Sequence, residues 1–181
     1  MTRLPTVPSS GLVDPVSAKS PSPLRKLTLA WSATDPEPGT PREAMLVAFA
    51  SRDRVHVDQH FGAAEGFVLY ALDTERARLA GVLEFAPESM DGNENKLAEK
   101  IGALAGCAAV YCLAVGGSAV RQLLAAGIQP MKLDAAEAIE PLLHAISSGM
   151  RDGGVPWIDK AMRRSADTSR FDRMAEEGWQ E

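Results

Sequence analysis

Apolar residues gather in short runs between about residues 44 and 150, and the runs follow two different periods. Runs of strand length predict five β-strands, at Met45–Ala50, 66–72, 78–85, 107–115 and 128–133. Three further stretches carry apolar residues three or four positions apart, as in a helix with one buried face, at about 93–105, 118–126 and 137–149. The predicted element order is therefore β-β-β-α-β-α-β-α.

This order and the character of the strands predict an α/β fold. The second and third strands are separated by about five polar residues, which favours an antiparallel hairpin. The fourth strand is apolar at both alternating sets of positions, which is typical of a central strand covered on both faces. We expect a mixed five-stranded sheet with helices on both faces, in which strands one, four and five run parallel and the hairpin extends one edge.

Local signals place the ends of two helices. Ser118 is suited to cap the second helix, and Gly127 is suited to end it in a left-handed conformation. Pro141 is tolerated only in the first turn of the third helix, because an interior proline removes a hydrogen bond. We therefore expect that helix to start near Glu137 or Ala138.

The two ends of the chain differ from the middle. Eight of the twelve prolines lie between Pro5 and Pro41, so residues 1–43 are expected to form a flexible leader. Within it, Leu24–Trp31 alternates enough to add an edge strand or to dock against a partner. Residues 44–150 form the predicted domain. Residues 151–181 are expected to form a partly helical tail with a single docked turn around Trp157.

Composition narrows the classes of function. The net charge is −5 and the chain has no block of basic residues, so a nucleic-acid partner is not expected. Only two cysteines occur, both in an apolar context, which favours a reducing cytoplasm over a disulfide framework. The apolar run nearest the start is too short for a membrane span, so a cytoplasmic protein without a membrane partner is expected.

The polar loop after the first strand carries the most distinctive chemistry. His56 and His60 are four residues apart, which puts both rings on one side of a helical or an extended backbone. Imidazole is a common ligand of transition metals, and the carboxylates and amide of the neighbouring Asp53, Asp58 and Gln59 can orient such rings by accepting the second N–H. The alternative is a loop in which the histidines are purely structural. Asp53 and Asp58 do not indicate a metal-dependent nuclease, because the two central strands carry no carboxylates.

Other candidate groups lie further along the chain. The turn Gly116-Gly117-Ser118 offers backbone N–H groups and the positive end of a helix dipole to an anion, or it is simply a tight turn. Cys107 and Cys112 are five positions apart and so face opposite sides of a straight strand, which favours two inert core residues over a shared metal site. His144 is expected to be structural.

Several of these segments together resemble one family. The chain is similar, over about residues 25–162, to the NifX/NafY family of nitrogenase cofactor-biosynthesis proteins. The segments that carry the similarity are Val47–Ser51 leading into His56–Gly62, then Gly116–Ser118, and finally Val155–Lys160. The His-Phe-Gly element is the most specific part. The resemblance implies a ribonuclease-H-like fold and a small carrier, without an enzymatic activity, that binds iron-sulfur precursors of the iron-molybdenum cofactor. It places the proposed cluster-contacting histidine at His60.

These observations lead to a hypothesis with two rivals. In the first, His60 and His56 bind an iron-sulfur precursor cluster, Asp58 and Gln59 support them, and the backbone of Gly116, Gly117 and Ser118 faces the anionic side. The expected partners are the cofactor-maturation scaffold and the proteins that synthesise the precursor. The rivals are an interaction module of the same machinery without a cluster, and a phosphate binder that uses the Gly116-Gly117 turn.

Overall fold

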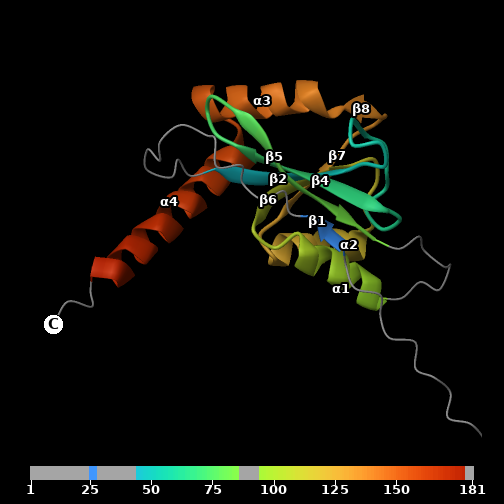
Figure 1. Ribbon diagram of the computed structural model, residues 1–181, viewed down its shortest axis with the longest axis horizontal. Helices are drawn as coiled ribbons and strands as arrows, with labels where there is room; N and C mark the ends of the chain where they lie inside the picture. Colours follow the sequence, from blue (N-terminus) through green and yellow to red (C-terminus); the bar gives the residue numbers. More distant parts are fainter. Residues whose placement is uncertain (1–24, 28–43, 86–93, 178–181) are drawn as a thin grey trace, which may run out of the picture.

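A computed structural model of the chain describes residues 25–27, 44–85 and 94–177 (Figure 1). Its centre is a mixed β-sheet covered by helices on both faces, as the sequence predicted. Helices α1 (Glu94–Ala103) and α2 (Gly117–Ala125) lie on one face, and α3 (Ile139–Asp152) lies on the other. Helix α4 (Pro156–Glu177) follows α3 and extends away from the sheet.

The main sheet has six strands in the order β1-β5-β4-β2-β6-β7. They are β1 (Arg25–Leu27), β2 (Met45–Ala50), β4 (Gly66–Leu72), β5 (Ala77–Glu84), β6 (Cys107–Cys112) and β7 (Gln129–Lys132). Strands β2, β6 and β7 run parallel, and β4 and β5 form the predicted antiparallel hairpin beside β2. Because the parallel strands end at the same edge of the sheet, the loop after β2 and the turn after β6 lie at one end of the molecule.

The structure has two β-sheet features that the sequence did not predict. Strand β1 pairs antiparallel with β5, so the predicted count of five strands was too low. Of the two interpretations of residues 24–31, an edge strand or a segment docked against a partner, the structure shows the edge strand. The other positions of the expected leader, 1–24 and 28–43, lie outside the described residues. A second, two-stranded sheet joins β3 (His56–Val57) to β8 (Glu137–Ala138) and thereby ties the histidine loop to the start of α3.

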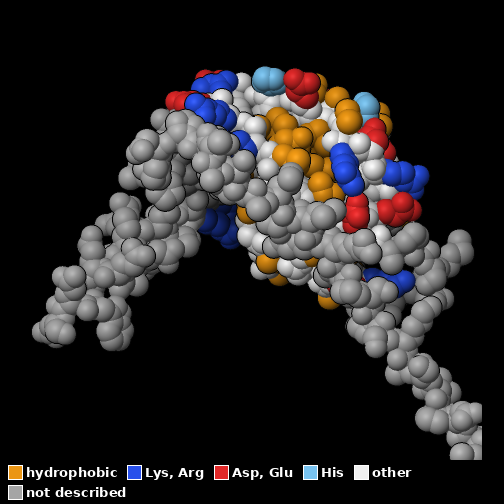
Figure 2. Space-filling view, in the orientation of Figure 1, with side chains coloured by type: hydrophobic (Ala, Val, Ile, Leu, Met, Phe, Trp, Pro, Cys, Tyr) orange, Lys and Arg blue, Asp and Glu red, His pale blue; other side chains and the backbone are white. Residues whose placement is uncertain are grey.

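Two apolar clusters fill the spaces on either side of the sheet. Phe61, Phe67 and Leu104 belong to the cluster beneath α1 and α2, whereas Phe49, Ile146 and Ile158 belong to the cluster beneath α3 and α4. The Phe49 ring stacks on the Tyr111 ring, with centroids 5.2 Å apart. Figure 2 shows that hydrophobic side chains also reach the surface beside α3.

The cysteines depart from the predicted geometry because β6 contains a β-bulge. Leu46 of β2 pairs with Cys107 but Val47 pairs with Ala109, so Ala108 is an extra residue in β6. An extra residue reverses the alternation of side chains at that point. Cys107 and Cys112 therefore both join the cluster beneath α1 and α2, and the prediction that they face opposite sides was wrong.

The predicted helix ends are partly confirmed. Gly127 has a φ of +79° after α2, as expected for a left-handed stop. Helix α3 begins at Ile139, which puts Pro141 in its first turn. The expectation for Ser118 was wrong: Gly116 is the N-cap, and Ser118 lies inside α2, where its hydroxyl accepts a hydrogen bond from Gln122 Nε2 at 3.2 Å.

The tail forms more than the expected single turn around Trp157. Helix α4 runs for 22 residues, and Ile158 is buried in the same cluster as Met150 of α3. Gly149 makes this approach possible, because a Cβ added there would lie 2.7 Å from Ile158 Cδ1. The start of α4 is therefore part of the folded domain. Among the helices that the structure describes, none is long and apolar enough to cross a membrane.

Candidate functional site

The histidine loop, residues 51–62, is fastened to the carboxyl end of β6 by backbone hydrogen bonds. The N–H of Leu113 donates to the carbonyl of Gln59 at 2.9 Å, and the N–H of Phe61 donates to the carbonyl of Ala114 at 2.8 Å. His60 lies between these two bonds. The loop is therefore held next to the chain segment that leads into Gly116 and α2.

Burial alternates along the loop and turns the histidines outward. Val57 and Phe61 have no exposed surface and Gln59 is buried, whereas His56 and His60 are exposed. This alternation follows the two-residue period of extended chain. The structure thus places both rings at the surface, on the side of the backbone opposite to the buried anchors.

Asp53 organises the first half of the loop. Its Oδ1 accepts hydrogen bonds from the backbone N–H groups of Val55 and His56, both at 2.8 Å, and its Oδ2 lies 2.7 Å from His56 Nδ1. The bond from the His56 ring and the two backbone bonds hold the pKa of the Asp53 carboxyl well below its usual range. When Nδ1 carries the proton in this bond, Nε2 of His56 is left with its lone pair for a ligand.

Asp58 and Gln59 bind the loop backbone. Asp58 Oδ1 accepts a hydrogen bond from the N–H of Arg52 at 2.9 Å. Gln59 Oε1 accepts hydrogen bonds from the N–H groups of Glu65 and Gly66, at 3.1 and 3.4 Å. Of the three polar neighbours that the sequence offered as orienting groups, Asp53 is the one that contacts the His56 ring. A side chain that bonds the N–H groups two and three residues ahead is a common turn motif, and the spacing of Asp53 and His56 fits it.

Lys100 is a second residue that sequence reasoning missed. The residue is 3% exposed, and its Nζ donates to the carbonyl of Gly62 in the His-Phe-Gly element. The ammonium also lies 5.8 Å from the centre of the Phe85 ring. Lys100 falls on the apolar stripe of α1, between Leu97 and Leu104, and a charged residue in such a stripe is a sign of a specific buried partner.

The Gly116-Gly117-Ser118 turn is exposed at the amino end of α2. No side chain caps this end, because Gly116 occupies the N-cap position. The Arg121 guanidinium reaches back toward it, and its Nη1 would lie 3.9 Å from a Cβ added at Gly117. Free N–H groups, the helix dipole and a nearby guanidinium all favour an anion at this position.

The two cysteines are poor ligands. Burial raises the pKa of the Cys107 thiol to about 12 and that of the Cys112 thiol to about 11. Both therefore stay protonated at neutral pH, as expected for inert core residues. His144, expected to be structural, is exposed on α3. Among the residues that the structure describes, no group of three or more His, Cys, Asp or Glu side chains is arranged to hold a metal ion.

The site thus brings three predicted pieces to one end of the sheet: the exposed His56 and His60, and the amino end of α2. It offers one or two exposed imidazoles on a loop whose backbone is bonded to the segment leading into the positively polarised end of α2. Such a set suits an anionic inorganic group that supplies most of its own bonding.

Comparison with known proteins gives a consistent result. The family model described as dinitrogenase iron-molybdenum cofactor matches residues 43–149. Protein NifX of Azotobacter vinelandii is 48% identical over 162 residues, which cover 88% of this chain and 99% of that protein. Protein NifX of Klebsiella pneumoniae is 38% identical and covers 74% of this chain and 83% of its own length. Among solved structures, the crystal structure of PH0822 is 22% identical, with a TM-score of 0.45, and covers 58% of this chain and 90% of that one.

Proposed function

This chain belongs to the NifX/NafY family of nitrogenase iron-molybdenum cofactor biosynthesis proteins, and from that premise we propose that it is a non-enzymatic carrier of iron-sulfur precursors of the cofactor. It receives a precursor cluster, holds it at the histidine loop and passes it on. The partners in this proposal are the maturation scaffold and the proteins that synthesise the precursor. The ribonuclease-H-like architecture is part of the same proposal, and the strand order β5-β4-β2-β6-β7 with β4 antiparallel to β2 supports it.

One observation carries this proposal: the backbone bonds between residues 59–61 and residues 113–114, which hold His60 beside the segment that enters α2. In the proposal, His60 coordinates a cluster iron through its exposed ring. The backbone of Gly116 and Gly117, with Ser118, faces the sulfide side of the cluster. Because sulfide carries negative charge, the positive end of α2 and the nearby Arg121 stabilise it.

His56 has the second role. Its ring is oriented by the bond to Asp53, which leaves the lone pair of Nε2 as a second ligand for iron. Asp58, Gln59 and Lys100 contribute by fixing the backbone on both sides of His60.

A small ligand set matches the needs of a carrier. Iron-sulfur clusters that stay in a protein are held by several cysteine thiolates, and a set of one or two imidazoles binds less tightly. Weak coordination lets a cluster exchange to a scaffold without unfolding of the carrier. No step in this transfer requires the protein to make or break a covalent bond within the cargo.

The test is an anaerobic titration of the purified protein with the isolated precursor cluster, followed by visible absorption. We expect His60→Ala to weaken binding at least tenfold, because loss of a ligand or of its support costs metal sites about 10–100-fold in affinity. His144→Ala is the matched control, because it removes an exposed histidine from α3, and it should leave the affinity unchanged.

A second variant separates orientation from coordination. Asp53→Asn removes the carboxylate that fixes the His56 ring, so we expect a smaller loss of affinity than for His56→Ala, together with a shift of the His56 ring tautomers seen by nitrogen NMR. An unchanged affinity of the His60→Ala variant would remove His60 from the site. A wild-type protein that binds no cluster but is still retained by a maturation protein would overturn the carrier role in favour of the interaction module.

A further inference from the structure

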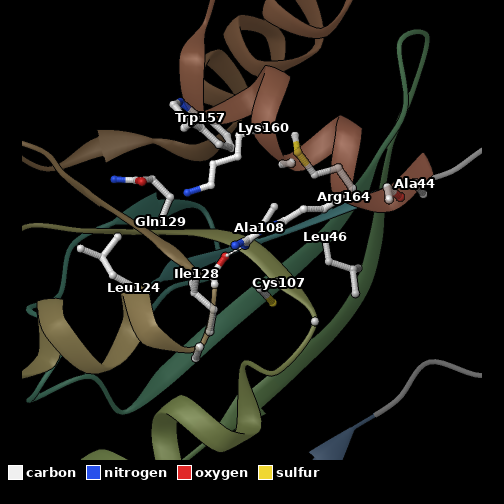
Figure 3. A pocket seen from close by; sticks show the side chains of 16 residues that line it. Ala44, Leu46, Cys107, Ala108, Leu124, Ile128, Gln129, Trp157, Lys160 and Arg164 are labelled. Carbon is white, nitrogen blue, oxygen red and sulfur yellow. Dashed lines mark hydrogen bonds between the residues drawn. The ribbon is translucent and has the colours of Figure 1, made fainter. Parts of the chain in front are cut away.

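A hollow on the described part of the chain lies at the end of the sheet away from the histidine loop. It has a volume of about 400 Å³, which is within the range of small-molecule sites. Its floor is formed by the first residues of β2, β6 and β7, and its side walls come from the end of α2 and the start of α4 (Figure 3). The cavity therefore lies where α4 meets the sheet.

The walls of this cavity, which we name the α4 cavity, are largely apolar. Leu46, Ala108, Leu124 and Ile128 line it from the sheet and α2, and Trp157 lines it from α4. The Trp157 ring is held edge-on to Tyr111, with centroids 6.5 Å apart and planes at 73°. A fixed indole ring and branched aliphatic side chains are suited to a flat apolar body.

The charged groups of the α4 cavity are all basic. Lys160 and Arg164 lie one turn apart on α4, on the side that faces the cavity, and none of the described residues that line the cavity is Asp or Glu. In Figure 3 the Lys160 chain runs from beside Trp157 toward Gln129. Arg164 Nη1 donates to the carbonyl of Gly127 at 3.1 Å, which fixes the guanidinium at the end of α2.

We propose that the α4 cavity binds a small organic anion, in which a carboxylate is attached to a flat apolar body. The carboxylate binds the Lys160 ammonium, and the body packs against Trp157 and the exposed side chain of Leu124. This site is separate from the histidine loop, because it lies at the amino ends of the strands whose carboxyl ends carry that loop.

Binding at this position has a structural consequence. The ligand contacts α4 on one side and β6, β7 and the end of α2 on the other, so it strengthens the attachment of α4 to the domain. Any ligand that binds the folded state alone also stabilises that state by mass action. We therefore expect slower amide hydrogen exchange in residues 156–165 when the ligand is present.

The experiment uses Trp157 as the reporter. In the 181-residue chain, Trp31→Phe and Trp179→Phe leave Trp157 as the single tryptophan, and its fluorescence is followed as 2-naphthoate is added. The uncharged 2-naphthamide has the same ring system and measures the part played by charge. We expect naphthoate to bind at least tenfold more tightly than the amide, since hydrogen bonds to charged groups are worth about 1.5–3 kcal/mol.

Two variants locate the anion. Lys160→Gln should weaken naphthoate binding about tenfold and leave amide binding unchanged. Lys132→Gln is the matched control, since it removes an exposed lysine of β7 that does not line the cavity. Ala161→Leu places extra volume in the cavity and should weaken both probes.

Several outcomes would overturn the proposal. Equal affinities for naphthoate and naphthamide would show that the cations do not select an anion. Naphthoate binding that resists both Lys160→Gln and Ala161→Leu would place the probe elsewhere on the chain. No binding by the wild-type sequence would mean that the cavity is closed in solution or filled by another part of the chain. None of these results affects the His60 titration, so the two proposals fail independently.

Discussion

Gln59 provides the sharpest test of how the histidine loop is built. The sequence suggested that its amide supports a bound cluster, whereas the structure directs its oxygen to two backbone N–H groups of residues 65 and 66. Its side chain is 8% exposed. Gln59→Leu keeps the approximate size of the side chain and removes the acceptor, so it isolates the contribution of these two bonds.

The expected loss of stability follows from the burial of the two donors. The bond to the Gly66 N–H is buried, and leaving such a donor without a partner costs about 1–3 kcal/mol. The Glu65 N–H is half-buried, so water replaces part of its lost bond and its contribution is smaller. We expect the free energy of unfolding to fall by about 2 kcal/mol, which lowers the Tm of a chain of this length by roughly 4–8 °C.

Urea unfolding followed by far-ultraviolet circular dichroism measures this change, and the m-value should stay constant. Gln122→Leu is the matched control, because Gln122 makes its hydrogen bond on the exposed surface of α2, and it should change the stability by less than about 0.5 kcal/mol. If Gln59→Leu is as stable as the wild type, the two N–H groups have other partners. Gln59 then becomes available to a ligand again, as the sequence suggested.

Two further predictions concern a glycine and the cysteines. Gly127→Ala should destabilise the protein by at least about 1–2 kcal/mol in urea unfolding, because its φ is +79° and its Cβ would lie 2.6 Å from Arg164 Nη1; Gly62→Ala, which meets no atom within 4 Å, should be nearly neutral. Thiols of the unfolded chain begin to ionise at about pH 9, whereas the buried thiols ionise only near pH 11 and 12. Their contribution to the free energy of unfolding should therefore be complete below about pH 9 and should be lost as the pH rises through about 11 and 12. The free energy of unfolding should therefore fall less between about pH 8 and pH 10.5 for the double variant Cys107→Ala, Cys112→Ala than for the wild type. An equal dependence of this free energy on pH in both proteins would contradict buried, protonated thiols.

The elements that the sequence predicted well are those whose signal is local. The apolar runs of β2, β4, β5, β6 and β7 are long and regular enough to define the strands, and the hairpin and the parallel set follow from the lengths of the connections. Gly127 and Pro141 behaved as expected because glycine and proline restrict the backbone at their own positions. By contrast, β1, β3 and β8 are only two or three residues long, and they become strands through their partners.

The candidate site shows the same division. His56 and His60 could be identified from their spacing, and their exposure follows from the alternation with Val57 and Phe61. The support for the loop could not be identified fully, because Lys100 reaches Gly62 from a helix 38 positions along the chain. The α4 cavity was also missed, since residues 151–181 were expected to form a tail that docks by a single turn around Trp157, outside the predicted domain.

The bulge in β6 shows why a correct strand is not enough to place side chains. One extra residue at Ala108 puts Cys107 and Cys112 on the same face, although five positions in a straight strand separate opposite faces. The same bulge lies at the amino end of β6, where Cys107 and Ala108 line the α4 cavity, whereas the carboxyl end remains regular and pairs with the histidine loop through Leu113 and Ala114. The two ends of this strand therefore support different surfaces: a regular one that positions His60, and an irregular one that leaves room beneath α4.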